Sequence, residues 1–153
     1  MTGIVISSDA FEDGGRIPRR HGYKNGNVSP ALSFSGVPAG ARSLALIMDD
    51  PDAMKPAGKV WSHWIIWNMP PDTTRIDEGS APPAGVVQGT TDFGSTGYGG
   101  PAPPDAEHTY VFAVYALDAE VKLGESATKQ QLEQAIKPHV MAKAEMRGRY
   151  SPD

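Results

Sequence analysis

Three apolar runs stand out against a mostly polar chain and predict the central strands of a β-sheet. Residues 43–48 are almost all apolar, which is typical of a strand that is buried on both faces. Residues 61–69 form a second run that ends at two prolines, and residues 109–117 form a third that is rich in Tyr, Val and Phe. We therefore expect a fold built around three long buried strands.

Shorter strands and ordered turns fill the rest of the first two thirds of the chain. Residues 4–7 and 31–34 predict brief strands, and the Asn25-Gly26 pair between them is a strong turn signal. Residues 82–104 are rich in glycine and proline and form a long connection, which in a compact domain is usually either functional or disordered. The aromatic residues Phe93 and Tyr98 within it favour an ordered, packed loop.

Helix is predicted only near the C-terminus. Thr128 and Gln131 have the spacing of a capping box, and Leu132, Ala135 and Ile136 then supply an apolar stripe. Pro138 should interrupt this helix, because proline removes a hydrogen bond and clashes with the preceding turn. We expect a second helical segment over residues 139–146, ending near Gly148, and a fold that is otherwise mostly β.

Composition narrows the class of protein. The chain has 153 residues, 39% hydrophobic and 21% charged, with a net charge of -4, which predicts one globular domain over residues 1–153. Without a basic excess, non-specific nucleic-acid binding is not expected. There are no cysteines, which excludes disulfides, thiolate metal sites and cysteine nucleophiles. The start of the chain does not resemble a secretory signal, and no run is long enough to span a membrane, so we expect a cytoplasmic protein.

Acids and histidines gather at the ends of the predicted strands. Asp50 and Asp52 follow the first apolar run, His63 lies near the start of the second, and His108 with Tyr110 opens the third. If these strands are neighbours, all five side chains converge at one end of the sheet. Carboxylates at the mouth of a buried strand are costly unless they are solvated, paired or used, so this convergence predicts a pocket.

Three kinds of chemistry fit such a pocket, and two of them are a metal site and a hydrolase. Two His and two Asp suit zinc or iron, although no HxH or HxxxH spacing presets two ligands on one element. In a hydrolase, His63 would act as general base oriented by Asp50. No G-x-S-x-G motif is present and Ser62 should face away from His63, so the nucleophile would be an activated water.

The third kind is a site for a small anion. His63 and His108 would donate hydrogen bonds, Tyr110 would offer its hydroxyl, and backbone N–H groups near Gly99 and Gly100 would approach the ligand closely. The acids would orient the imidazoles and favour their protonated form, so affinity should rise as pH falls toward the histidine range. A protein-interaction module with a vestigial pocket remains an alternative.

Several separated motifs also resemble one known family. In chain order they are Ile17-Pro18, Asn25-Gly26-Asn27-Val28-Ser29-Pro30, Val37-Pro38-Ala39-Gly40, Asp50-Pro51-Asp52-Ala53, Trp61-Ser62-His63-Trp64 with Trp67-Asn68-Met69-Pro70, Thr91-Asp92-Phe93-Gly94, Gly97-Tyr98-Gly99-Gly100-Pro101 and His108-Thr109-Tyr110. The pattern resembles the bacterial branch of the phosphatidylethanolamine-binding protein family, which includes the Raf kinase inhibitor protein. The resemblance runs almost from end to end.

The resemblance implies a large central antiparallel sheet packed with a smaller sheet, and a short C-terminal helical segment. It implies a shallow cavity for phosphate, a phospholipid headgroup or a carboxylate, with no cofactor and with binding rather than catalysis as the activity. It also implies a kinase or protease partner and a homodimer. The ligand-contacting positions of the family fall on Asp50, Asp52, Trp61, His63, Gly100, Pro101, His108 and Tyr110.

Three positions depart from the family pattern. Met54 follows D-P-D-A where the family often has a proline and a cis peptide, so we expect this turn to differ. Thr109 follows His108 where the family usually has an arginine, and Ala102 replaces a cysteine that is common in the bacterial loop.

Overall fold

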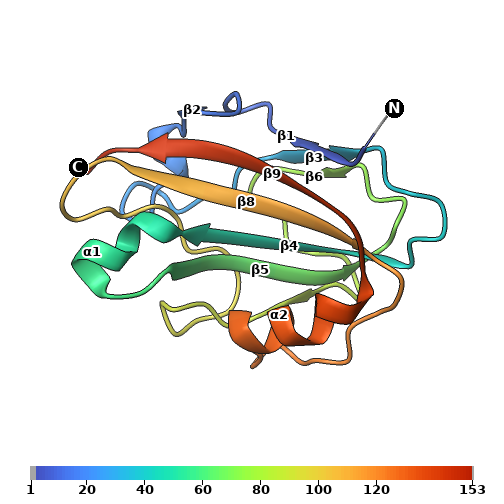
Figure 1. Ribbon diagram of the computed structural model, residues 1–153. Coiled ribbons are helices and arrows are strands. Elements are labelled where there is room, and N and C mark those ends of the chain that lie inside the picture. Colours follow the sequence, from blue (N-terminus) through green and yellow to red (C-terminus); the bar gives the residue numbers. More distant parts are fainter. Residues whose placement is uncertain (1–2, 153) are drawn as a thin grey trace.

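The computed structural model describes residues 3–152, which form two β-sheets, two α-helices and short 3-10 turns (Figure 1). The larger sheet has six strands, and its pairs are antiparallel except for a two-residue parallel pair at one edge. Its order is β2 (Gly15–Arg16), β9 (Val140–Tyr150), β8 (His108–Leu117), β4 (Ser43–Asp50), β5 (Trp61–Met69) and β7 (Val87–Gln88). The three strands predicted from the apolar runs are confirmed as β4, β5 and β8, which lie side by side.

A smaller sheet packs on one face of the larger one. It consists of β1 (Val5–Ser7), β3 (Leu32–Ser35) and β6 (Arg75–Ile76), with β3 in the middle. Ile6 and Phe34 from this sheet share one buried cluster with Leu46 and Phe112 from the larger sheet. The predicted mostly-β fold of two packed sheets is therefore confirmed.

Helices cover little of the sheet. The capping box is confirmed at the start of α2 (Lys129–Ile136), where the backbone N–H of Thr128 donates to Oε1 of Gln131 at 2.9 Å. Pro138 lies in the 3-10 turn η3 (Lys137–His139) that follows, so the helix ends where proline was expected to interrupt it. Leu132 and Ile136 pack against the face of the large sheet that is opposite to the small sheet (Figure 1).

Three further short helical segments lie outside the C-terminal region, which the sequence did not predict. They are η1 (Arg19–His21), η2 (Pro51–Ala53) and α1 (Met54–Ala57). Asp50 caps η2 through its carboxylate, which accepts the backbone N–H of Asp52 at 3.0 Å. The D-P-D-A motif is thus a capped turn that leads directly into α1.

The predicted helix over residues 139–146 is wrong, because this segment belongs to the long strand β9. Its residues include good helix formers, but they pair with β8 along the whole strand and tertiary pairing overrides local propensity. Along β9, Met146, Gly148 and Tyr150 are buried, whereas Glu145 and Arg147 are exposed and Arg149 is partly exposed. That period-two alternation is the signal of a strand.

Met1, Thr2 and Asp153 lie outside the described residues, so the expectation about a secretory signal falls partly on residues that the structure does not describe. Among residues 3–152, no helix is both long enough and apolar enough to cross a membrane.

Candidate functional site

A cavity of about 210 Å³ lies where the end of β4 meets the beginnings of β5 and β8. The antiparallel order produces this meeting, since Asp50 pairs with Trp61 on β5 and Asp49 pairs with Val111 on β8. Figure 1 shows α1 at the same end of the sheet. The cavity is lined by Asp50, Ala53, Pro56, Ala57, Trp61, His63, Phe93, Ala102, Pro104, His108 and Tyr110. Of the five side chains predicted to converge, Asp50, His63, His108 and Tyr110 line the cavity and Asp52 does not. With Trp61, five of the eight candidate residues are in the lining.

His63 is held by a backbone carbonyl. Its Nδ1 lies 2.7 Å from the carbonyl oxygen of Gly99, and its ring makes edge contacts with Phe93 and Tyr110 at centroid distances of 5.3 and 5.1 Å. Burial lowers the pKa of His63 to about 4, despite the opposing effect of the Gly99 and Gly100 carbonyls. The ring is consequently neutral near pH 7, and the expectation of a protonated imidazole at this position is wrong.

His108 is clamped between two carboxylates. Its Nδ1 lies 2.6 Å from Oδ2 of Asp50 and its Nε2 lies 2.7 Å from Oδ1 of Asp105. Burial alone would lower the pKa of His108, but the two carboxylates outweigh it and the pKa is raised. Asp50 therefore orients His108 and not His63, and both nitrogens of His108 are already occupied.

Three of the candidate residues support the cavity without lining it. Asp52 accepts the backbone N–H of Thr109 at 2.8 Å and so fixes the start of β8. The N–H of Gly100 donates to Oδ1 of Asn27 at 2.7 Å, and the carbonyl of Pro101 accepts the N–H of Tyr23 at 2.9 Å.

The backbone N–H groups expected to meet an anion are not free. The N–H of Gly99 donates to the carbonyl of His63 at 2.8 Å, and that of Gly100 is bound to Asn27. The expectation that this glycine pair supplies backbone donors is therefore wrong. What Gly100 provides is close packing, because a Cβ there would collide with the carbonyl of His21.

Two residues that line the cavity carry a buried hydrogen-bond donor without a partner at full hydrogen-bond geometry among the described residues. They are Trp61, through its indole N–H, and Tyr110, through its hydroxyl, on which Asp50 and the backbone of Ala102 act only through weaker contacts. Burial, and then the nearby charge of Asp50, raise the pKa of Tyr110, so its hydroxyl keeps its proton. An unsatisfied buried donor costs about 1–3 kcal/mol, so a ligand oxygen that met these groups would recover that energy.

Phe93 is the main wall residue that the sequence did not single out as part of the site. It stacks on Tyr23 with ring centroids 4.3 Å apart and an interplanar angle of 5°, and it meets Trp61 edge-on at 5.7 Å. The residue before it, Asp92, accepts the backbone N–H of Ser62 at 2.8 Å and the Nζ of Lys59 at 2.7 Å. The sequence signal for Phe93 was its position as an aromatic residue in the glycine- and proline-rich loop over residues 82–104.

The turn after D-P-D-A also contributes to the wall. Ala53, Pro56 and Ala57 line the cavity from η2 and α1, and no pattern in the sequence marked them. Met54 is 55% exposed and does not line the cavity, and among residues 3–152 every peptide bond is trans. The turn at Met54 therefore has a trans peptide bond, and Met54 is the first residue of the short helix α1.

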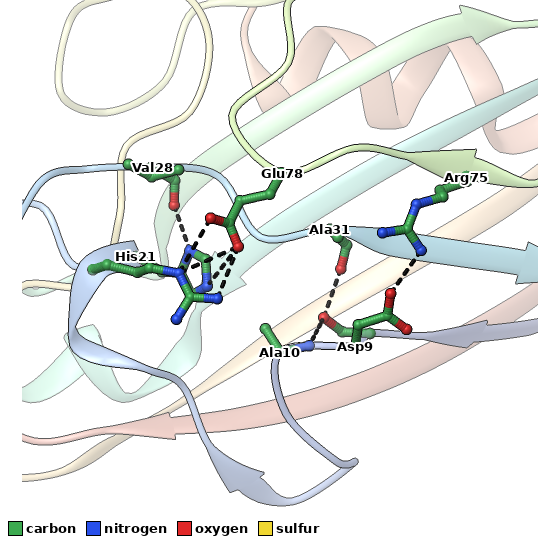
Figure 2. A network of polar contacts seen from close by, with 9 residues as sticks. Asp9, Ala10, His21, Val28, Ala31, Arg75 and Glu78 are labelled. Carbon is green, nitrogen blue, oxygen red and sulfur yellow. Dashed lines mark hydrogen bonds and ion pairs between the residues drawn. The ribbon is translucent and has the colours of Figure 1, made fainter.

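A network of polar contacts surrounds one buried histidine, His21 (Figure 2). His21 is fully buried, and its Nδ1 lies 2.6 Å from the carbonyl of Val28. Arg20 forms a bidentate pair with Glu78. Oε1 of Glu78 lies 3.8 Å from Nε2 of His21 (Figure 2). The backbone carbonyl of His21 accepts the hydroxyl of Tyr98 at 2.7 Å, which ties this segment to the Gly/Pro loop.

The geometry does not favour a metal site or a hydrolase in which Asp50 orients His63. Within the part of the chain that the structure describes, no group of three or more His, Asp or Glu residues is placed to hold a metal ion. The hydroxyl of Ser62 accepts the backbone N–H of Asp92 at 3.1 Å, so it is engaged away from His63. The carboxylate that was expected to orient His63 is bound to His108.

Comparison with known proteins agrees with this fold and with the motifs. The sequence model described as Phosphatidylethanolamine-binding protein matches residues 7–151. A UPF0098 protein of Methanothermobacter thermautotrophicus is 46% identical over 149 residues, which cover 95% of this chain and 97% of that protein. The UPF0098 protein YbhB of Escherichia coli is 40% identical over 159 residues, which cover 96% and 99%.

Two solved structures are similar over essentially their whole length. The phosphatidylethanolamine-binding protein homologue CT736 from Chlamydia trachomatis has a TM-score of 0.93 and 39% identity, covering 100% of both chains. Escherichia coli YbcL, described as a member of the mammalian PEBP family, has a TM-score of 0.92 and 31% identity, covering 99% of this chain and 100% of its own. The chain belongs to the phosphatidylethanolamine-binding protein family.

Proposed function

We propose that the cavity binds a small ligand through an acidic oxygen group of the phosphate or carboxylate type. The observation that carries the proposal is the pair of unpartnered donors, Trp61 Nε1 and the Tyr110 hydroxyl, in the lining of one small cavity. Phosphate and carboxylate oxygens accept several hydrogen bonds at once, so they match converging donors. A ligand without acceptors would leave both donors unsatisfied.

The size of the cavity limits the ligand. About 210 Å³ is below the range of roughly 300–1,000 Å³ that is typical of sites for drug-sized molecules. It suits a headgroup or a phosphorylated side chain, with the rest of a larger ligand outside. The aromatic and proline walls would contact its apolar part. Modulation of a kinase or protease by the occupied protein is the biological role we propose on the family resemblance.

A small ammonium ligand is the strongest rival. Asp50 provides a carboxylate, and the aromatic rings of Trp61, Phe93 and Tyr110 line the same cavity, which is a combination that binds organic cations. Two facts favour an acidic group. Asp50 already accepts from His108 and from the backbone of Asp52, and a cation would leave both buried donors without an acceptor.

The indole N–H signals in a ¹H–¹⁵N spectrum test the proposal directly. Inorganic phosphate and acetate should shift the Trp61 signal, whereas Trp64 and Trp67 serve as internal controls because their N–H groups are bound to Gln88 at 2.7 Å and to the Leu123 carbonyl at 3.2 Å. Trp61→Phe assigns the signal.

A conservative variant measures the contribution of the hydroxyl. Tyr110→Phe should weaken phosphate binding roughly tenfold, because it removes one donor to a charged group. Tyr115→Phe on the same strand is the matched control, since Tyr115 does not line the cavity. A Trp61 signal that responds to tetramethylammonium and not to phosphate would show that the proposal is wrong.

A further inference from the structure

The polar atom that His63 offers to the cavity is an acceptor and not a donor. A carbonyl oxygen can only accept, so the 2.7 Å contact with Gly99 places the proton of the neutral ring on Nδ1. Nε2 is then an unprotonated nitrogen, since the hydrogen bond that the ring forms within the described part of the chain is at Nδ1. Because His63 lines the cavity, a ligand in the cavity meets a lone pair at this position.

Asp50 is a second acceptor in the same lining. The nearby ionisable groups form a chain of Asp50, His108 and Asp105, in which one imidazole stands between two carboxyl groups. Burial raises the pKa of Asp50, and the hydrogen bond with His108 opposes that effect. The other charged group that acts on His63 is Asp92, which is paired with Lys59. A fully deprotonated dianion would therefore face both a lone pair and a carboxylate.

We infer that the cavity selects a phosphate monoester in its monoprotonated form, ROPO₃H⁻, because that group offers one O–H donor together with several acceptor oxygens. The O–H would point to Nε2 of His63, and the remaining oxygens would accept from Trp61 and Tyr110. This inference rests on the proposed function and specifies its ligand. It separates the monoester from two groups of the same charge, a sulfate monoester and a phosphodiester, since neither of these carries a proton to donate.

The low pKa of His63 is consistent with this selection. Burial lowers the pKa to about 4, so near pH 5.5 the ring stays mostly neutral while a phosphate monoester, with a second pKa of about 6, is mostly monoprotonated. The ligand therefore supplies the shared proton in this pH range. The selection would otherwise require proton uptake by a buried ring, which costs free energy.

Three monoanionic probes of similar size provide the test: methyl phosphate, methyl sulfate and dimethyl phosphate. Each is titrated into the full chain at pH 5.5, and binding is followed by the indole signal of Trp61 with Trp64 and Trp67 as internal references. Methyl phosphate should bind about tenfold more tightly than the other two, because each of them leaves the acceptor of His63 unmatched. Raising the pH to 7.5 should weaken methyl phosphate about twentyfold, following the loss of its monoanion.

The outcomes separate the two proposals. Equal binding of methyl phosphate and methyl sulfate at pH 5.5 would overturn the protonated-ligand inference but leave the anion site standing. A Trp61 signal that responds to none of the three probes, and not to inorganic phosphate, would overturn the proposed function itself. The comparison uses the unmodified protein, so it does not depend on whether a substituted cavity still folds.

Discussion

His63 and His108 share one cavity, yet their surroundings hold their protons differently. Burial keeps the His63 ring neutral and outweighs the opposing effect of the Gly99 carbonyl, whereas His108 faces two carboxylates, which favour a charged ring. Burial pushes the pKa of both rings down, and only His108 has carboxylate partners on both nitrogens to reverse that effect. Because of this difference, His63 and not His108 can offer a nitrogen lone pair to a ligand.

The depressed pKa of His63 should make the protein less stable in mild acid. Above about pH 6.5 the ring is neutral in both the folded and the unfolded chain. As pH falls from 6.5 toward 4, the unfolded chain takes up a proton that folded His63 does not, so the free energy of unfolding decreases. The decrease is about 3 kcal/mol at pH 4. Urea unfolding followed by tryptophan fluorescence between pH 7 and pH 4 measures this loss.

Two variants isolate the contribution of His63 from that of the carboxylates. His63→Gln keeps an N–H that can donate to Gly99 but cannot take up a proton, so its stability should fall less steeply with acid than that of the wild type. His139→Gln is the matched control, because that ring is exposed and far from the cavity lining. If the two variants change the slope equally, the assignment to His63 fails.

Sequence reasoning could find the residues of the site better than their roles. The positions of Asp50, His63 and His108 at strand ends were enough to predict that they meet. Which group holds each imidazole depended on the fold of the Gly/Pro loop, because the partner of His63 is a backbone carbonyl 36 positions away and carries no side-chain signal. The sequence could not predict that Nε1 of Trp61 lacks a hydrogen-bond partner, because this also depends on how the surrounding loops fold.

At the scale of elements, the strand β9 shows where local propensity misleads. Its Ala, Lys, Glu and Met residues favour helix in isolation, but pairing with β8 from Val140 to Tyr150 gives the segment an antiparallel partner along its length. Met146, Gly148 and Tyr150 are buried at every second position, which is the period of a strand. This pattern after Pro138 was the sequence signal for a strand.

Gly148 is a position in β9 where the surrounding side chains leave no room for a Cβ atom. A Cβ there would lie 2.6 Å from Cγ1 of Ile17 and 2.7 Å from Cε2 of Phe11, inside the core between the two sheets. Gly148→Ala should lower the free energy of unfolding by about 1–3 kcal/mol through overpacking. Gly124→Ala is the matched control, because a Cβ there meets nothing within 4 Å.

Thermal and urea unfolding of both glycine variants measure the difference. The control should be neutral or slightly stabilising, since alanine restricts the unfolded chain more than glycine does. A Gly148→Ala protein as stable as the control would mean that β9 does not press against Ile17 and Phe11 as described.

At the scale of the whole molecule, the two buried clusters share the same strands. Leu46 on β4 faces the small sheet, while its neighbours Ala45 and Ile47 face α2. Likewise Trp64 on β5 belongs to the first cluster and Trp67 to the second. Because alternate residues of one strand serve both clusters, neither layer can lose its packing without disturbing the other, and we expect residues 1–153 to unfold as one domain.

Leu132 on α2 provides the test of that coupling. It is fully buried against the large sheet, so Leu132→Ala should lower the free energy of unfolding by about 2–5 kcal/mol. The exposed helix residue Gln130 gives the control substitution, Gln130→Ala, which should change stability little. If the clusters are coupled, the variant should still unfold in a single transition, with far-UV circular dichroism and tryptophan fluorescence coinciding at the lower midpoint. Early melting of the helix signal while fluorescence stays native would show instead that α2 is a separable layer.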